Sequence, residues 1–214
     1  MSIQDQLEQA KARFLANVPE IAQESIFQQM EEQQQSGRVF GLDAGLRAPN
    51  FTLTNIDGQP FTLYDELAKG PVVLTFYRGS WCPYCNIQLR GYEQILPDIK
   101  RYGCQLAAVS LQSQENSLSQ AEKEKLTFPV LRDPGGLVSD SYNLLFDLPA
   151  YLQNTYTHIL NLDLLAFNET GRWVLPVPAT FLIDSEGVIR SASVIPDFMQ
   201  RLEPSEIIEQ LKKL

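Results

Sequence analysis

The sequence is poor in cysteine and histidine, and this shortage narrows the classes of protein to consider. Its 214 residues include three cysteines and one histidine. So few cysteines, and an odd number, do not make a disulfide scaffold, and in a reducing compartment a close cysteine pair is more often catalytic or metal-binding. A zinc site needs four ligands, normally cysteine or histidine. Beyond one close pair only Cys104 and His158 remain, without a recognisable ligand spacing, so we expect no metal site.

Basic residues and long apolar runs are also scarce. The chain has 17 basic and 26 acidic residues, a net charge of −9. An acidic surface repels phosphate backbones, so we expect no nucleic-acid partner. No stretch approaches the ~20 apolar residues that span a bilayer, and the start, Met1 to Gln6, lacks the basic and apolar segments of a secretory signal. We therefore expect a cytoplasmic protein with no membrane partner.

Residues 1–36 contain two amphipathic helical patterns, which are divided at Pro19. An amphipathic face needs something to cover it. This segment is therefore interpreted as a packing arm or as an oligomer contact, such as a homodimer interface. We divide the chain into an N-terminal helical extension, 1–45, and a domain, 46–214. The first helical stripe is Ile3, Leu7, Ala10 and Phe14.

From Ala48 onwards short strands alternate with helices. A continuous apolar run at 71–77 is typical of a strand buried on both faces. A helix is expected from Pro83, disturbed at Pro97, and 137–167 is expected to be mainly helical. This alternation predicts an α/β fold with a parallel sheet covered by helices and finished by an antiparallel hairpin. The other expected strands are 51–55, 59–63, 105–111, 128–131, 179–184 and 188–193, and the other helices are 113–125 and 204–214.

The cysteine pair lies where a strand ends and a helix begins. Pro83 suits the first helical position, which places Cys82 at the cap, facing unpaired backbone N–H groups and the positive end of the helix dipole. Cysteines in such settings have pKa values of roughly 3.5–7.5 instead of about 8.5. Arg78 is a candidate for further positive charge. We therefore expect a reactive thiolate at Cys82.

The second cysteine occupies a different position on the same helix. Cys85 heads an apolar stripe, so its sulfur is expected to turn toward the core while Cys82 stays at an exposed tip. An accessible nucleophile with a recessed partner is the arrangement that thiol–disulfide exchange requires. Cys104 lies in an apolar strand and is interpreted as buried and structural, and His158 as a surface or capping residue.

Beyond these local signals, several motifs resemble the peroxiredoxins of the alkyl hydroperoxide reductase and thiol-specific antioxidant family. They are Ala48-Pro49-Asn50-Phe51, the Asp57-Gly58 hairpin, the strand end Phe76-Tyr77, and Ala179-Thr180-Phe181-Leu182-Ile183-Asp184 with Gly187. The resemblance covers about 46–212 and implies a thioredoxin-like fold, a central mixed sheet flanked by helices. It places Cys85 at the peroxidatic position, Cys82 at the family's threonine, and Pro178 where the family has its peroxide-activating arginine. The 143–176 segment is longer than the family usually has and either covers the active site or forms a subunit contact.

The cysteine motif itself is similar to thioredoxins. Trp81-Cys82-Pro83-Tyr84-Cys85 and Val177-Pro178-Ala179-Thr180 resemble their active-site and cis-proline segments. This similarity implies a cis peptide at Pro178, lying against the cysteine pair and presenting backbone to a substrate. It makes Trp81, Pro178 and Arg78 the candidate substrate-binding residues.

Three functions follow, and the first is peroxide reduction. In it a Cys82/Cys85 dithiol–disulfide cycle reduces hydroperoxides and is regenerated by an external thiol donor, such as a thioredoxin or glutathione system. The family similarity spans most of the chain and puts this function first, with Arg78 or Arg90 as substitutes for the missing arginine. The second is a disulfide oxidoreductase with Cys82 attacking and Cys85 resolving. The third is a non-catalytic redox-responsive binding protein. None needs a cofactor, and which cysteine attacks first stays open.

Overall fold

The computed structural model describes residues 2–168 and 170–214 and is built around a seven-stranded sheet in the order β2-β1-β5-β4-β3-β8-β9. The central strands β3, β4 and β5 are parallel, whereas β1, β2, β8 and β9 join antiparallel. This confirms the mixed sheet with its antiparallel C-terminal hairpin. The strands are β1 Thr52–Asn55, β2 Pro60–Thr62, β3 Val72–Phe76, β4 Gln105–Ser110, β5 Val130–Arg132, β8 Ala179–Ile183 and β9 Ile189–Val194.

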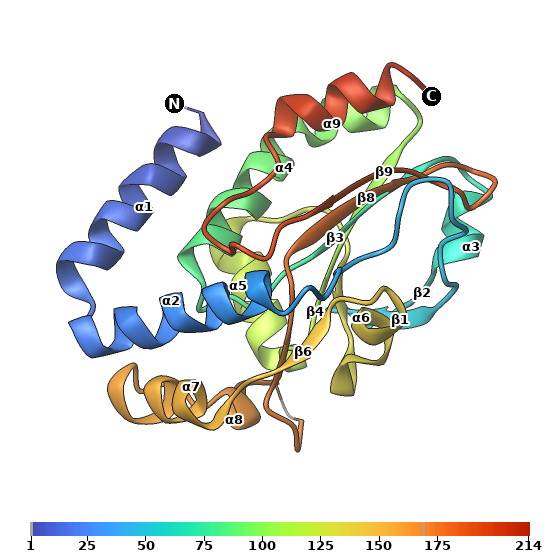
Figure 1. Ribbon diagram of the computed structural model, residues 1–214. Coiled ribbons are helices and arrows are strands. Elements are labelled where there is room, and N and C mark those ends of the chain that lie inside the picture. The colour runs from blue at the N-terminus through green and yellow to red at the C-terminus, as the bar shows by residue number, and fades with distance from the viewer. Residues whose placement is uncertain (1, 169) are drawn as a thin grey trace.

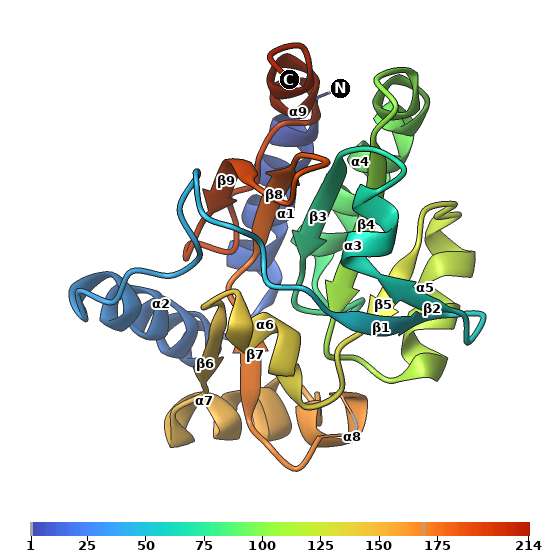
Figure 2. The same cartoon turned by 90° about the vertical axis from the view of Figure 1, so that its right-hand side faces the viewer.

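Helices cover both faces of this sheet (Figure 2). On one face lie α4 (Pro83–Arg101), α5 (Gln114–Glu124) and α9 (Pro204–Leu211); on the other lie α3 (Leu63–Leu67) and α6 (Leu137–Ser141). Side chains alternate between faces along a strand, so Val73 belongs to the core under α4 and Leu74 to the core on the opposite face. The continuous apolar run of β3 is explained by burial on both sides.

The N-terminal arm consists of α1 (Ile3–Asn17) and α2 (Glu20–Gln35), as predicted. Figure 1 shows α1 beside α4, and α2 beside α7 (Ala150–Asn154). Ile3 fits so closely onto α4 that a Cβ on Gly91 would lie 2.6 Å from its Cγ2 atom. The Tyr151 hydroxyl also donates to Glu32 at 2.5 Å. The chain therefore covers the apolar face of its own arm, which accounts for the amphipathic pattern without a second subunit.

The 137–167 segment is mainly helical, as predicted, but it also contains a strand that was not predicted. It contains β6 (Leu145–Asp147), which pairs with β7 (Val174–Pro176) in a separate two-stranded sheet. A short apolar run does not distinguish strand from helix by periodicity, and the pairing strand lies far along the chain. The helical remainder is α7, a π-helical turn at Thr155–Ile159, and α8 (Leu164–Asn168).

α4 runs through Pro97 without a break, so the disturbance expected there is limited to the carbonyl that loses its backbone partner. Pro97 is exposed, where water can satisfy the carbonyl that its ring leaves unpaired, and the neighbouring Leu96 and Ile99 are buried. Within the described parts of the chain, no helix combines the length and apolar character needed to cross a bilayer.

Candidate active site

The loop between β3 and α4 places the cysteine pair as the sequence predicts. Cys82 is the N-cap of α4 and Pro83 its first residue. The amide N–H groups of Cys85 and Asn86 donate to the Cys82 carbonyl at 3.1 and 3.2 Å. Gly79, with a φ of 148°, lets the Trp81 indole fold back over it, since a Cβ there would lie 2.5 Å from Nε1 of that indole. The loop is therefore tightly turned.

A ring of buried polar side chains holds this loop from behind. The Ser80 amide donates to Gln112 at 2.9 Å, and the Ser80 carbonyl accepts from Asn86 at 2.7 Å. Gln120 donates to Asn86 at 2.6 Å and accepts from Gln112 at 2.8 Å, and it also accepts from the Tyr77 hydroxyl at 2.9 Å. Satisfied buried networks of this kind fix geometry. Sequence analysis missed it, because its members are scattered over 44 positions from Tyr77 to Gln120.

Both sulfurs are buried, so the prediction of an exposed tip at Cys82 is wrong. Cys82 is 1% exposed and Cys85 0%. Tyr156, which lies outside the local cysteine motif, contributes to this cover. Trp81 packs edge-on against it, with ring centroids 5.5 Å apart. Tyr156 belongs to the long 143–176 segment, which therefore covers the active site.

Arg201 is a functional residue that sequence analysis did not find. Its Nη2 group donates to the Cys85 sulfur at 3.4 Å, although the two residues are 116 positions apart. The guanidinium is itself buried, and its other terminal nitrogen donates to the carbonyls of Phe198 and Gln200. No motif marks Arg201, because it reaches Cys85 only through the fold of the loop between β9 and α9.

The charge of the pair resides on Cys85 and not, as predicted, on Cys82. Burial opposes ionisation of Cys85, but a hydrogen bond with Cys82, the nearby Arg201 and Arg78, and the backbone N–H of Arg78 together hold its pKa well below the usual value. Burial raises the pKa of Cys82, and the hydrogen bond and the negative charge of Cys85 raise it further. These pKa shifts favour a reduced site in which a Cys82 thiol donates to a Cys85 thiolate.

Arg78 lies beside the pair, where its charge was expected. Its guanidinium is 4% exposed, donates to the Tyr156 hydroxyl, and lies 4.8 Å from the Trp81 ring centroid and 3.9 Å from that of Phe198. No ion pair to a carboxylate forms at Arg78 within the described residues. A buried cation needs a compensating negative charge, and the Cys85 thiolate supplies one.

Pro178 does not have the predicted cis peptide, since all peptide bonds in the described residues are trans. The chain on both sides is held extended: the Val177 amide donates to the Leu144 carbonyl at 2.9 Å, and the Pro178 carbonyl accepts from the Ile195 amide at 3.2 Å. An extended segment leading into β8 is satisfied by the ordinary trans bond. Pro178 borders a small cavity with Arg201, on the Cys85 side of the site.

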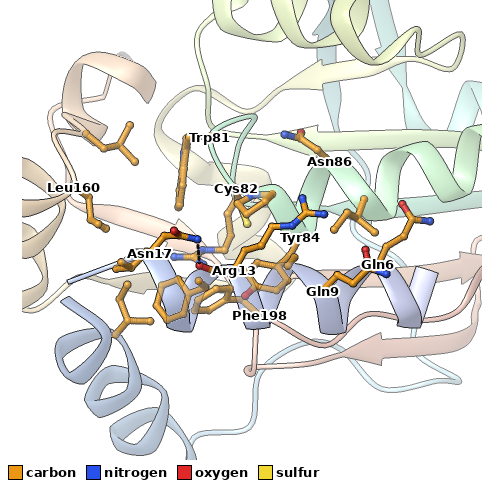
Figure 3. Close-up of a pocket in the computed structure, with 18 of the residues that line it drawn as sticks. Gln6, Gln9, Arg13, Asn17, Trp81, Cys82, Tyr84, Asn86, Leu160 and Phe198 are labelled. Carbon is orange, nitrogen blue, oxygen red and sulfur yellow. Dashed lines mark hydrogen bonds between the residues drawn. The ribbon is translucent and has the colours of Figure 1, made fainter. Parts of the chain in front are cut away.

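A pocket of about 820 Å³ opens on the other side, between α1 and the start of α4 (Figure 3). Cys82, Trp81 and Arg78 line it, whereas Cys85 and Pro178 do not. Arg90, the other candidate substitute for the missing arginine, also lines it but pairs with Glu124 at 2.5 Å. Of the predicted site residues, the structure thus gathers Cys82, Trp81 and Arg78 around one pocket, leaving Cys85 behind it.

The remaining cysteine and the histidine are where they were expected. Cys104 is 2% exposed at the start of β4, and burial raises its pKa to about 12, so it is an inert thiol at neutral pH. His158 is exposed on the π-helical turn.

Comparison with known proteins fixes the family. The AhpC/TSA family model matches residues 44–192, which is most of the chain. The protein belongs to the AhpC/TSA family. Two kinds of curated relative match at the same sequence identity. The thiol-disulfide oxidoreductase ResA of Bacillus thuringiensis is 26% identical over 174 residues, covering 81% of this chain and 79% of ResA. Peroxiredoxin Bcp of Escherichia coli is 26% identical over 172 residues, covering 80% and 97%.

Solved structures agree on the fold. Peroxidoxin BcpB from Mycobacterium tuberculosis superposes with a TM-score of 0.63 at 18% identity, covering 82% of this chain and 99% of BcpB. A putative protein disulfide isomerase from Bacteroides thetaiotaomicron gives a TM-score of 0.57 at 23% identity, covering 82% and 93%. The thioredoxin-like fold is thus confirmed. With relatives of both enzyme types, the chain is a thiol-dependent oxidoreductase that uses a thiol reductant and acts on peroxide or disulfide substrates.

The site differs in two ways from the peroxiredoxin pattern that the sequence resembles. The resemblance implies that Cys85 takes the peroxidatic position, that Cys82 stands where the pattern has a threonine, and that Pro178 stands where it has an arginine. The structure supplies a buried guanidinium to Cys85 from elsewhere, through Arg201. The positive charge that the family resemblance leads us to expect beside the Cys85 sulfur is therefore present, but it comes from a different part of the chain.

Proposed function

We propose that this protein is a thiol–disulfide oxidoreductase in which Cys82 attacks the substrate and Cys85 resolves. The observation that carries this proposal is the division of the pair between two environments. Cys82 lines a pocket of about 820 Å³, a volume typical of sites for small organic molecules. Cys85 is recessed behind it against Arg201. This favours the function that family resemblance placed second.

The resting hydrogen bond supports a simple proton path. The Cys82 sulfur attacks one sulfur of a disulfide RSSR while its proton passes to the Cys85 thiolate; the Cys82–S–S–R bond forms and one RS⁻ leaves. Cys85 then gives that proton to the departing thiolate and attacks the Cys82 sulfur. The second RS⁻ leaves and the Cys82–Cys85 disulfide forms. Two electrons pass to the substrate, yielding one RSH and one RS⁻, and an external thiol donor of the thioredoxin or glutathione kind re-reduces the protein.

In this scheme Cys85 is first a base and then a nucleophile. Arg201 and Arg78 stabilise its negative charge in the reduced state. Trp81 and Arg78 line the pocket beside Cys82 and are positioned to contact the substrate. Pro178, which borders the other side of the pair, has no substrate contact in this proposal.

Peroxide reduction is the second candidate, and one observation favours it. The thiolate is Cys85, and the buried guanidinium groups of Arg78 and Arg201 both lie close enough to act on its charge. In that reaction Cys85 attacks the peroxide oxygen, alcohol or water leaves, and Cys82 condenses with the sulfenic acid to form the disulfide and water. Cys85 does not line the pocket, whereas Cys82 does; this counts against peroxide reduction, because a substrate must reach the attacking sulfur.

Stopped-flow oxidation of the reduced protein tests the choice, with tryptophan fluorescence as the signal. We expect 2-hydroxyethyl disulfide to oxidise the pair much faster than it oxidises free cysteine, and hydrogen peroxide to react no faster than with free cysteine. The opposite order would establish the peroxidase instead. A double variant, Cys82→Ser with Cys85→Ser, provides the background. We also propose that the protein is cytoplasmic and binds neither nucleic acid nor membranes; its net charge of −9 disfavours binding to nucleic acid and to anionic membrane surfaces.

A further inference from the structure

The first helix of the chain forms one wall of the active-site pocket. Its apolar stripe packs on α4, but a neighbouring stripe faces the space beside Cys82, as Figure 3 shows. That stripe recurs every three or four residues, so its members share one side of the helix. They all carry hydrogen-bonding groups, although the packing of the arm does not require polar residues there. They are Gln6, Gln9, Arg13 and Asn17.

The pocket is positively charged in an acidic protein. Arg13 and Lys123 line it, and neither forms an ion pair within residues 2–168 and 170–214. Arg78 also lines it, but the Cys85 thiolate balances its charge. The acidic group in the lining, Glu124, is already paired with Arg90 at 2.5 Å. The chain as a whole carries −9, so this local excess attracts anions to the site.

Buried donors around the pocket lack partners. Three of these groups have no hydrogen-bond partner in the described structure: the Arg78 Nε, the Trp81 Nε1 and the Tyr84 hydroxyl. Arg78 is 4% and Tyr84 2% exposed. Leaving buried polar groups unpaired costs free energy, but all three atoms are sealed from solvent, so a ligand in the open pocket does not reach them.

We propose that this pocket binds a low-molecular-mass disulfide whose substituents carry carboxylate groups. Arg13 and Lys123 attract the carboxylates, the polar stripe of α1 supplies hydrogen-bonding groups, and the disulfide sulfur meets Cys82. This inference rests on the disulfide chemistry proposed above. Because α1 stands over the sulfur, the arm favours a small molecule over a folded protein and makes the N-terminal extension part of the substrate site.

Kinetics with two disulfides and three variants test the proposal. Oxidised glutathione carries carboxylates and 2-hydroxyethyl disulfide does not. We expect Arg13→Gln to raise KM for oxidised glutathione roughly threefold and the double variant with Lys123→Gln roughly tenfold, the size of one and two exposed charge contacts. KM for the uncharged disulfide should not change. Lys11→Gln is the matched control, because Lys11 is exposed on the same helix and does not line the pocket.

Two results would overturn the proposal. One is an equal response of both disulfides to Arg13→Gln, and the other is an equal effect of Lys11→Gln and Arg13→Gln. If no disulfide is reduced at all, the proposed function itself fails. Binding of S-methylglutathione, an unreactive thioether, to the wild-type protein by calorimetry separates these cases. Binding that weakens in Arg13→Gln but not in Lys11→Gln supports the pocket without any turnover, and no binding to the wild type contradicts it.

Discussion

The two sides of the first turn of α4 differ in what they offer a sulfur. On the pocket side, Cys82 meets open volume and a polar wall, but burial and its neighbour keep it protonated. On the opposite side, Cys85 has no access to the pocket but meets Arg201, and its pKa is lowered. Access and charge are thus supplied to different sulfurs by different parts of the chain. The short hydrogen-bonded path between them lets one dithiol use both.

Replacing each cysteine in turn should break this division most completely. Cys82→Ser is expected to abolish disulfide reduction, because the pocket then holds no sulfur. Cys85→Ser is expected to accumulate a mixed disulfide at Cys82, detected as added mass on the intact protein and located by peptide mapping. A sulfenic acid trapped on Cys85 in Cys82→Ser, after treatment with peroxide, would show that the recessed sulfur is the one that attacks.

Removing the charge behind Cys85 should change the redox balance. Arg201→Met takes away a cation that stabilises the reduced, thiolate form, so the disulfide becomes harder to reduce. We expect the reduction potential to become roughly 30–60 mV more negative, which corresponds to one to two powers of ten in the equilibrium constant. Equilibration with glutathione redox buffers measures it. Arg190→Met, which removes an arginine paired with Asp184, is the control, and an equal shift in both variants would argue against a specific role.

Removing the hydrogen-bond acceptor of Arg78 should have a smaller effect on activity. Tyr156→Phe removes the hydroxyl that accepts from Arg78 while keeping the ring beside Trp81. We expect a roughly fivefold loss of kcat/KM, equivalent to about 1 kcal/mol for one hydrogen bond. We also expect the pH–rate profile to shift to higher pH. Tyr151→Phe is the matched control, because it removes the contact with Glu32 on the arm instead. An unchanged pH–rate profile in Tyr156→Phe would mean that Tyr156 serves only packing.

The smallest effect is expected at Cys104. Its burial and raised pKa, about 12, make it unreactive near neutral pH. Cys104→Ala should leave turnover unchanged and lower the free energy of unfolding by about 1 kcal/mol, through the loss of a small buried side chain. Thermal unfolding and steady-state rates measure the two effects. A loss of activity comparable with that of Cys82→Ser would contradict the structural role.

Local sequence patterns explain how much of this site was predictable. The apolar run of β3, the proline after Cys82 and the stripe below Cys85 are encoded within a few residues of each other, and the strand, the cap and the recessed sulfur were all predicted. The burial of Cys82 and the charge on Cys85 depend on Tyr156 and Arg201, which arrive from 74 and 116 positions away, counted from Cys82 and Cys85 respectively. Spacing carries no trace of such contacts. The prediction of a cis peptide at Pro178 was wrong for the opposite reason. The local motif resembled thioredoxin, but the strands on both sides hold this segment extended.

The most direct test is the ionisation of the reduced pair, followed by thiolate absorbance against pH. For the wild type we expect an inflection well below pH 8.5, the ordinary value for cysteine, and for Arg201→Met an inflection at least about one pH unit higher. Because the pKa of Cys85 is lower in the folded than in the unfolded chain, its ionisation stabilises the fold above pH 8.5. That stabilisation is lost as the pH falls through the folded value. An inflection at or above pH 8.5 in the wild type, or one that Arg201→Met leaves in place, would contradict a Cys85 thiolate held by Arg201.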